Sequence, residues 1–101
     1  MEKYAARLLL ATHPDTVQAT PLVEQYVKYG ASPRGMQAMI LGGKVRALLD
    51  GRFNVSVEDV QQVAHPALRH RMILNFEGEA EEVKPDHLIE EIIGKTTVEA
   101  E

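Results

Sequence analysis

Cysteine is absent from this chain of 101 residues, and so is tryptophan. Without cysteine the protein has no disulfide, no thiolate metal ligand and no cysteine nucleophile. This composition is typical of proteins kept in a reducing compartment, and we expect a cytoplasmic location. The chain is otherwise composed like a globular domain, with 45% hydrophobic and 26% charged residues, and its length predicts a single domain.

Long apolar runs are also lacking. The hydrophobic stretch in MEKYAARLLLATH is short and interrupted by charges, so it predicts neither a signal peptide nor a membrane span. Charge is unevenly placed, because residues 1–76 carry a net +3 whereas residues 77–101 carry a net −7. The basic part is suited to an anion, but the acidic end argues against general nucleic-acid binding. We therefore expect no membrane and no nucleic acid as partner.

Motifs for metal binding or stand-alone catalysis are missing as well. LGGKVR resembles a phosphate-binding P-loop, but the residue after Lys44 is Val45 rather than Ser or Thr, and Ala38 stands where the first Gly is required. The serines, Ser32 and Ser56, are better explained as helix caps than as nucleophiles. No histidine has the spacing of a metal ligand. The four histidines are His13, His65, His70 and His87.

Helical periodicity dominates the rest of the sequence. Apolar residues share one face of a first helix at positions 4, 5, 8, 9 and 12, and start and stop signals predict further helices over 21–29, 33–50, 57–68 and 85–93. Alternation in RHRMILNF predicts a short strand, for which RFNV at 52–55 is the natural partner. The expected fold is mainly α, a small helical bundle with at most a short two-stranded β ribbon (about 52–55 with 71–75). Residues 1–94 form the domain and 95–101 a frayed tail.

The expected helix over 33–50 has two features of its own. A wide apolar face is predicted from its large hydrophobic residues, which are Met36, Ile40, Leu41, Val45 and Leu48. Gly42 and Gly43 cost about 1 kcal/mol each relative to alanine in mid-helix, so we expect a neighbouring helix to approach closely there.

Arg34 lies in the first turn of this helix, where the positive end of the helix dipole makes a cation unfavourable. A phosphate at this place would make the interaction favourable, because it accepts hydrogen bonds from the guanidinium and from the free N–H groups of the helix start. Gly30 is expected to end the preceding helix in a left-handed conformation, while Ser32 and Pro33 fix the start of the next. The pattern predicts an arginine on a rigid corner, with an exposed surface arginine as the alternative.

Several further motifs occur along the chain: GASPR at 30–34, ALL at 47–49 with GR at 51–52, VEDV at 57–60 and LRHR at 68–71. Together they resemble the C-terminal lid of MoxR-type AAA+ ATPases. The resemblance extends over about residues 4–94, and GASPR with LRHR at this separation is specific. A Gly42-Gly43 pair stands where the family usually has a small pair such as Ala-Ala.

The resemblance implies a function for the chain and a role for Arg34. In the family, the lid packs over the nucleotide of a P-loop core domain, and the arginine of GASPR is the sensor-2 arginine that reaches the terminal phosphates. Ser32, Pro33 and Arg34 would therefore face the phosphates of ATP and its Mg²⁺ in a parent ATPase. Implied partners are that core domain, neighbouring ring subunits and von Willebrand factor A proteins, in chaperone-like assembly or activation of protein complexes. The chain alone looks like a lid without its core, and we expect it to be monomeric, to bind no cofactor and not to hydrolyse ATP.

Other assignments stay open at this point. Arg69 and Arg71, on one side of the expected strand, are predicted either to pair with acids on neighbouring helices or to contact the core domain or another subunit. A free-standing helical protein-interaction module would have the same fold. A helix-turn-helix DNA binder is less well supported, since Glu58 and Asp59 make the start of its second helix acidic.

Overall fold

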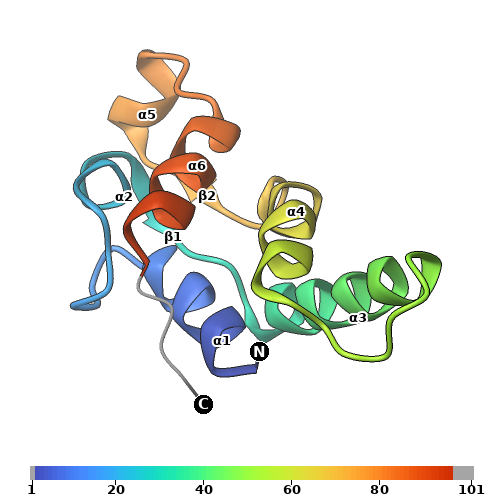
Figure 1. Cartoon of the computed structure of the whole chain (residues 1–101). Coiled ribbons are helices and arrows are strands. Elements are labelled where there is room, and N and C mark those ends of the chain that lie inside the picture. Colours follow the sequence, from blue (N-terminus) through green and yellow to red (C-terminus); the bar gives the residue numbers. More distant parts are fainter. Residues whose placement is uncertain (1, 97–101) are drawn as a thin grey trace.

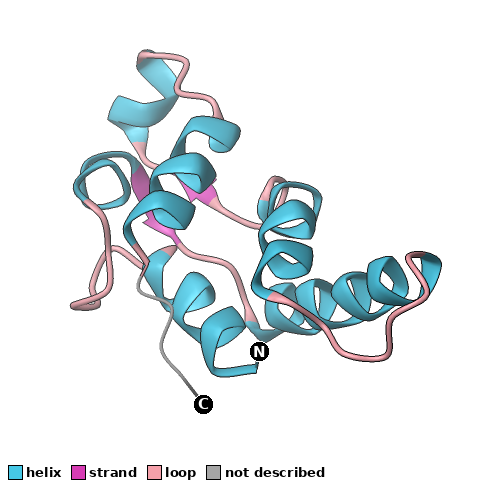
Figure 2. Ribbon diagram, in the orientation of Figure 1, coloured by secondary structure: helices cyan, strands magenta, loops and turns pink. Residues whose placement is uncertain are grey.

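A computed structural model describes residues 2–96 as six helices joined by turns and one short β ribbon (Figures 1 and 2). The helices are α1 (Glu2–Ala11), α2 (Pro21–Tyr26), α3 (Pro33–Leu49), α4 (Val57–Leu68), α5 (Phe76–Ala80) and α6 (Pro85–Lys95). The strands are β1 (Val27–Tyr29) and β2 (Ile73–Leu74). The mainly α prediction is confirmed. No helix within residues 2–96 is long and apolar enough to cross a membrane.

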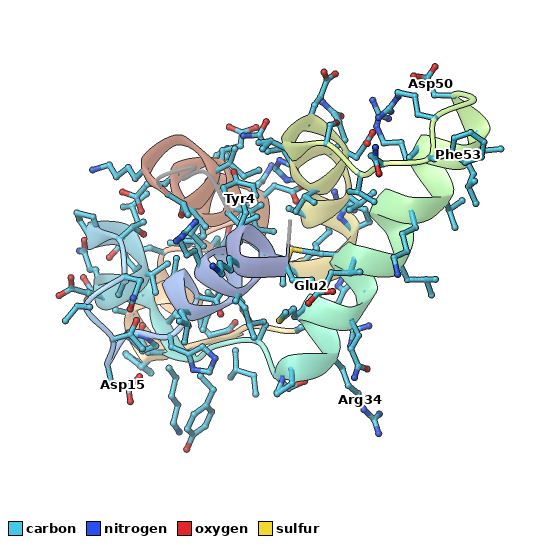
Figure 3. All side chains as sticks on the ribbon, turned by 60° about the horizontal axis from the view of Figure 1, so that its bottom comes forward. Glu2, Tyr4, Asp15, Arg34, Asp50 and Phe53 are labelled. Atoms are coloured by element: carbon cyan, nitrogen blue, oxygen red, sulfur yellow. The ribbon has the colours of Figure 1, made fainter. Side chains whose placement is uncertain are left out.

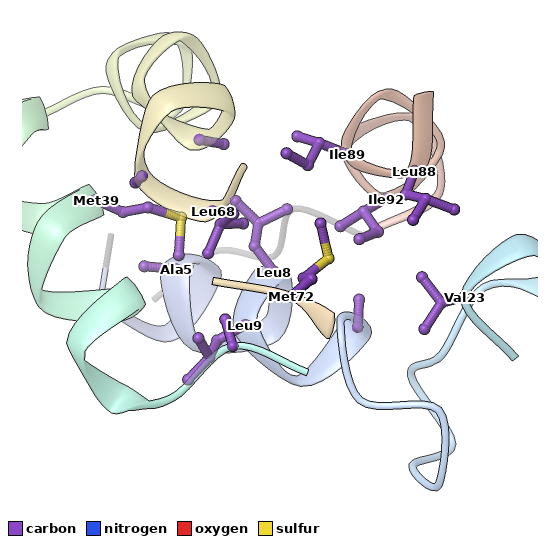
Figure 4. Packing of buried hydrophobic residues seen from close by; sticks show 14 of the residues in the cluster. Ala5, Leu8, Leu9, Val23, Met39, Leu68, Met72, Leu88, Ile89 and Ile92 are labelled. Carbon is purple, nitrogen blue, oxygen red and sulfur yellow. The ribbon is translucent and has the colours of Figure 1, made fainter. Parts of the chain in front are cut away.

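The core lies where α1, α3, α4 and α6 meet (Figure 4). The predicted stripe of α1 is confirmed, since Tyr4, Ala5, Leu8, Leu9 and Thr12 are all buried. Side chains from the other three helices are fully buried against it: Met39, Leu68, Leu88, Ile89 and Ile92. Removing this apolar surface from water stabilises helices that would be marginal in isolation.

The two-stranded ribbon exists, but its predicted pairing of 52–55 with 71–75 is wrong. β1 pairs with β2 in antiparallel fashion, with Val27 opposite Leu74 and Tyr29 opposite Ile73. The helix expected over 21–29 ends at Tyr26, because the next three residues join the ribbon, and the backbone N–H of Asn75 donates to the Tyr26 carbonyl at 2.8 Å. Residues 52–55 instead belong to the connection between α3 and α4.

The predicted apolar face of α3 is wrong for Leu41, Val45 and Leu48, which are exposed, whereas Met36 and Ile40 are partly buried against the core. The fully buried residues of α3 are Gly35, Met39, Gly43 and Ala47, spaced four apart. The expected close approach is confirmed: a Cβ at Gly43 would lie 3.0 Å from Val55 Cγ1, and one at Gly42 would lie 3.3 Å from Val63 Cβ. Small residues face α4 because the two helices pack too closely for larger ones.

Local signals at the later helices agree better with the structure. Ser56 caps α4 as predicted, in a capping box with Asp59, and α4 continues without interruption through Pro66. Lys84 provides no side-chain cap to α6. This helix passes the predicted stop at Gly94 and includes Lys95. Residues 97–101 of the expected tail lie outside the part of the chain that the structure describes.

Candidate functional site at the start of α3

Residues 30–34 form a corner between β1 and α3. Pro33 is the first helical residue, so its ring fixes the backbone at the point where the chain turns into α3. Ser32 occupies the N-cap position in an extended conformation, but its side chain makes no capping hydrogen bond. The position of the predicted cap is therefore correct, although its hydroxyl is exposed and does not cap the helix.

Arg34 projects from this corner into solvent (Figure 3). The first turn of α3 contains no acidic residue. Within residues 2–96, no ion pair or side-chain hydrogen bond of Arg34 is present. Its exposure fits both interpretations of the sequence, the arginine that contacts a phosphate held elsewhere and the ordinary surface arginine. A positive side chain at the positive end of a 17-residue helix is thus left without compensation from the described part of the chain.

The end of α1 lies directly against the backbone of this corner. The Thr12 hydroxyl accepts a hydrogen bond from the Ala31 N–H at 2.9 Å, and His13 Nε2 donates to the Ala31 carbonyl at 2.7 Å. The prediction that Gly30 adopts a left-handed conformation is wrong, since Gly51 is the one glycine with positive φ among the described residues. Gly30 is needed for space, because a Cβ there would lie 2.6 Å from the Thr12 carbonyl oxygen.

A surface hollow of about 490 Å³ adjoins the corner. His13, Lys28, Tyr29 and Ser32 contribute to its lining, and Lys28 Nζ lies 5.3 Å from the centroid of the Tyr29 ring. Lys28 therefore adds a second exposed cation close to the start of α3. Sequence reasoning did not single out this lysine or His13.

Arg69 lies at the C-cap of α4 and binds a carboxylate of α6, so the predicted placement of Arg69 and Arg71 in a strand is wrong. Arg69 Nε donates to Asp86 Oδ1 at 2.8 Å, and His65 Nδ1 donates to the same oxygen at 3.2 Å. The Arg69 and His65 hydrogen bonds lower the pKa of Asp86. Arg71 Nε donates to the Ala67 carbonyl at 2.8 Å. For Arg69, the structure thus matches the ion-pair alternative.

A buried carboxylate holds the connection between α3 and α4. Asp59, 1% exposed, accepts two hydrogen bonds of 2.8 Å from the Arg52 guanidinium and one of 2.9 Å from the Ser56 N–H. Arg46 Nε lies 3.3 Å from Asp59 Oδ1. The Arg52 hydrogen bonds, followed by that of Ser56, hold the pKa of Asp59 well below its usual range. This network fixes Arg52 and explains why 52–55 are not available for strand pairing.

The outward surface of α3 and the loop after it expose large apolar side chains, which we call the α3 apolar face. Its members are Leu41, Val45, Leu48, Leu49 and Phe53, and Leu49 and Phe53 are 85% and 95% exposed. A groove of about 500 Å³ runs beside it, lined in part by Val45, Leu49, Arg52 and Val63. Apolar side chains gathered on one exposed surface are typical of a contact with another protein or domain.

Comparison with known proteins identifies the family. The AAA lid domain family matches residues 19–92. Chaperone MoxR1 of Mycobacterium tuberculosis is 32% identical over 90 residues, which are 89% of this chain and 24% of that protein. Protein MoxR of Paracoccus denitrificans is 39% identical over 49 residues, or 48% of this chain and 14% of that protein. The chain therefore spans at most about a quarter of these curated relatives.

A solved structure gives the same result for the fold. The crystal structure of a candidate ATPase from Cytophaga hutchinsonii superposes with a TM-score of 0.92 at 34% identity, covering 98% of this chain and 30% of that one. The helices around the corner thus have the arrangement seen in a much longer protein. The chain belongs to the AAA lid domain family, and its sequence is similar to part of the MoxR proteins.

Proposed function

We propose that Arg34 is the sensor-2 arginine of this lid and contacts the terminal phosphates of ATP, bound with Mg²⁺ on a P-loop core domain. The observation that carries the proposal is the exposed Arg34 on the first turn of α3, with no ion pair inside residues 2–96. The family adds that such lids occur with nucleotide-binding domains. Ser32 and Pro33 contribute by setting where α3 begins.

Electrostatics explain why a phosphate suits this place. A phosphoryl group accepts hydrogen bonds from a guanidinium in a fixed, two-pronged geometry, and a helix start presents free N–H groups to an anion. The same dipole that disfavours Arg34 alone favours the arginine and phosphate together. Phosphoryl transfer depends mainly on positioning and charge stabilisation, both of which an arginine carried by a lid supplies.

Such a contact makes the position of the lid depend on the γ-phosphate. After hydrolysis the attraction between Arg34 and the nucleotide weakens, so the lid and the core separate more easily. The α3 apolar face offers a surface for the core domain or a neighbouring ring subunit. We propose that this motion drives chaperone-like assembly or activation of protein complexes in the cytoplasm, with von Willebrand factor A proteins as partners. One relative carries the name chaperone.

The proposal is tested in an ATPase that carries this lid. Arg34→Ala should lower ATP turnover by about tenfold or more, because a phosphate-contacting arginine stabilises charge in the transition state. Arg34→Lys should recover only part of the rate, since lysine keeps the charge but not the planar fork. Lys44→Ala, which removes an exposed cation from the same helix, is the matched control and should keep wild-type turnover.

Circular dichroism of the 101-residue chain should show the same melting temperature for Arg34→Ala and wild type, within about 3 °C, because exposed substitutions rarely change stability much. Wild-type turnover in a folded Arg34→Ala enzyme would contradict the sensor-2 role.

The α3 apolar face also favours a second candidate, a free-standing protein-interaction module. The two differ in what the gene encodes. A Walker motif about 200 residues upstream in the same reading frame is required by the ATPase proposal, and its absence would favour the interaction module.

A further inference from the structure

We infer that Thr12 and His13, at the end of α1, are positioning residues that hold the Arg34 corner in the orientation needed to reach a phosphate. This inference rests on the proposed role of Arg34. Neither side chain contacts the nucleotide in this scheme. Both act through the backbone of Ala31, three residues before Arg34.

The Thr12 hydroxyl links α1 to the corner through two buried hydrogen bonds. It donates to the Leu9 carbonyl at 2.6 Å and accepts from the Ala31 N–H at 2.9 Å. Thr12 and Ala31 are both completely buried. Because a buried backbone N–H without a partner is costly, the Ala31 amide has a strong preference for this one position.

His13 binds the backbone carbonyl of the same residue, Ala31. Its Nε2 donates to the Ala31 carbonyl at 2.7 Å, so the two residues that directly follow α1 bind the donor and the acceptor of Ala31. Both backbone polar groups of one residue are therefore tied to α1. Such a pair of bonds restrains rotation of the segment as well as its distance from the helix.

The backbone of the corner also touches α1 without any side chain between them. A Cβ at Gly30 would lie 2.6 Å from the Thr12 carbonyl oxygen and 2.7 Å from His13 Cγ. The path from α1 to Arg34 is short, consisting of Gly30, Ala31, Ser32 and the rigid Pro33. A catalytic side chain must be held close to its productive geometry, and a displacement of about 1 Å can cost as much as 100-fold in rate.

The two hydrogen bonds from Thr12 and His13 to the Ala31 backbone, which we call the clamp, are tested first in the 101-residue chain. Thr12→Val has nearly the same shape and removes both hydrogen bonds, so hydrogen exchange of the Ala31 amide should accelerate about tenfold or more. Thr12→Ser keeps the hydroxyl and should retain wild-type protection. Thr20→Val is the matched control, because Thr20 is also buried and its hydroxyl accepts the Val23 N–H at the start of α2. Unchanged exchange at Ala31 in Thr12→Val would overturn the clamp.

The role of His13 is tested through the hydrogen bond that its side chain donates to Ala31. His13→Gln places an amide N–H where Nε2 donates and should preserve the protection of Ala31, whereas His13→Leu should lose it. Equal protection in His13→Gln and His13→Leu would overturn the role of the His13 hydrogen bond.

The functional arm uses an ATPase that carries this lid. Thr12→Val should lower kcat for ATP about 10-fold, and Thr12→Ser should restore it, while Thr20→Val leaves it unchanged. In the double variant with Arg34→Ala, Thr12→Val should cause no additional loss, because it acts through the arginine. A full additional loss would overturn the inference.

The two proposals fail in different ways. Loss of turnover in Arg34→Ala together with normal turnover in Thr12→Val would refute the positioning role and leave the sensor-2 role standing. Normal turnover in Arg34→Ala would refute the sensor-2 role, and with it the catalytic part of the inference, whereas the Ala31 exchange measurement would still decide whether the clamp exists.

Discussion

Gly30→Ala is expected to destabilise the chain although alanine is usually the better residue. The added Cβ would lie 2.6 Å from the Thr12 carbonyl oxygen and 2.7 Å from the Thr12 carbonyl carbon. Both atoms belong to the backbone at the end of α1, so a change of side-chain rotamer cannot relieve the clash. Residues 30–31 must move away from α1, which stretches the 2.9 Å and 2.7 Å hydrogen bonds of Ala31.

The magnitude follows from three opposing contributions. Overpacking of this kind costs about 1–3 kcal/mol, and weakening the two hydrogen bonds adds up to about 1 kcal/mol each. Restricting the unfolded chain returns about 0.4–1 kcal/mol. At the middle of these ranges, the net change in the free energy of unfolding is a loss of about 2 kcal/mol, which lowers the melting temperature of a domain of this size by roughly 8–16 °C.

Thermal unfolding followed by circular dichroism at 222 nm measures this shift, and Gly94→Ala is the matched control. Gly94 lies in α6 and a Cβ there would have no atom within 4 Å, so alanine should stabilise the chain by up to about 1 kcal/mol. The same chemical change is thus expected to have opposite signs at the two positions. A Gly30→Ala chain as stable as wild type would refute the close-approach argument, and with it the rigid contact between α1 and the corner.

Two further predictions test the packing of α3 and the network around Asp59. Met39→Ala should cost about 2–5 kcal/mol of unfolding free energy because Met39 is fully buried, whereas Leu48→Ala should change it by less than about 0.5 kcal/mol; equal losses in urea titrations would contradict the assigned burial. Because the folded-state pKa of Asp59 is lowered, its contribution to stability is complete above the unfolded pKa of about 4 and is lost as the pH falls further. Asp59→Asn should therefore be less stable than wild type at pH 7, and the difference should shrink between pH 4 and pH 2; a difference that stays constant over this range would exclude the ionised Asp59 as its source.

Local signals in the sequence predicted the helices well where one residue decides the outcome. The cap at Ser56 depends on groups only a few residues away, and it is confirmed. The start of α3 at Pro33 is confirmed for the same reason.

Contacts between distant residues were predicted less well. The pairing of β1 with β2 depends on Asn75, whose side chain donates to the Gln25 carbonyl at 2.7 Å and whose N–H donates to that of Tyr26. No local pattern reveals a contact across 50 residues. The hydrophobic pattern of α3 also misled, because size alone selected Leu41 and Leu48 for the core, whereas the close approach of α4 leaves little room for a side chain at Gly42 and Gly43.

The network around Asp59 was visible only in part. Glu58 and Asp59 both lie in the first turn of α4, where a carboxylate is favourable, but nothing in their order shows which one turns inward. Asp59 is buried and Glu58 is exposed, because the carboxylate at the third helical position reaches back to the Ser56 N–H. The hydrogen bonds between Arg52 and Asp59 then depend on the path of the loop between α3 and α4.

In α3, small residues lie on the buried side and large hydrophobic residues lie on the exposed side, so the two sides are under different evolutionary constraints. Substitution of Gly43 or Ala47 by a large residue would push α4 away, so the fold alone restricts these positions in every lid of this shape. The fold places no such demand on Leu41, Leu48 or Leu49, whose side chains lie outside it. Substitutions on the buried side of α3 would therefore be limited by the fold of the domain, and substitutions on the exposed side by the partner that this side contacts.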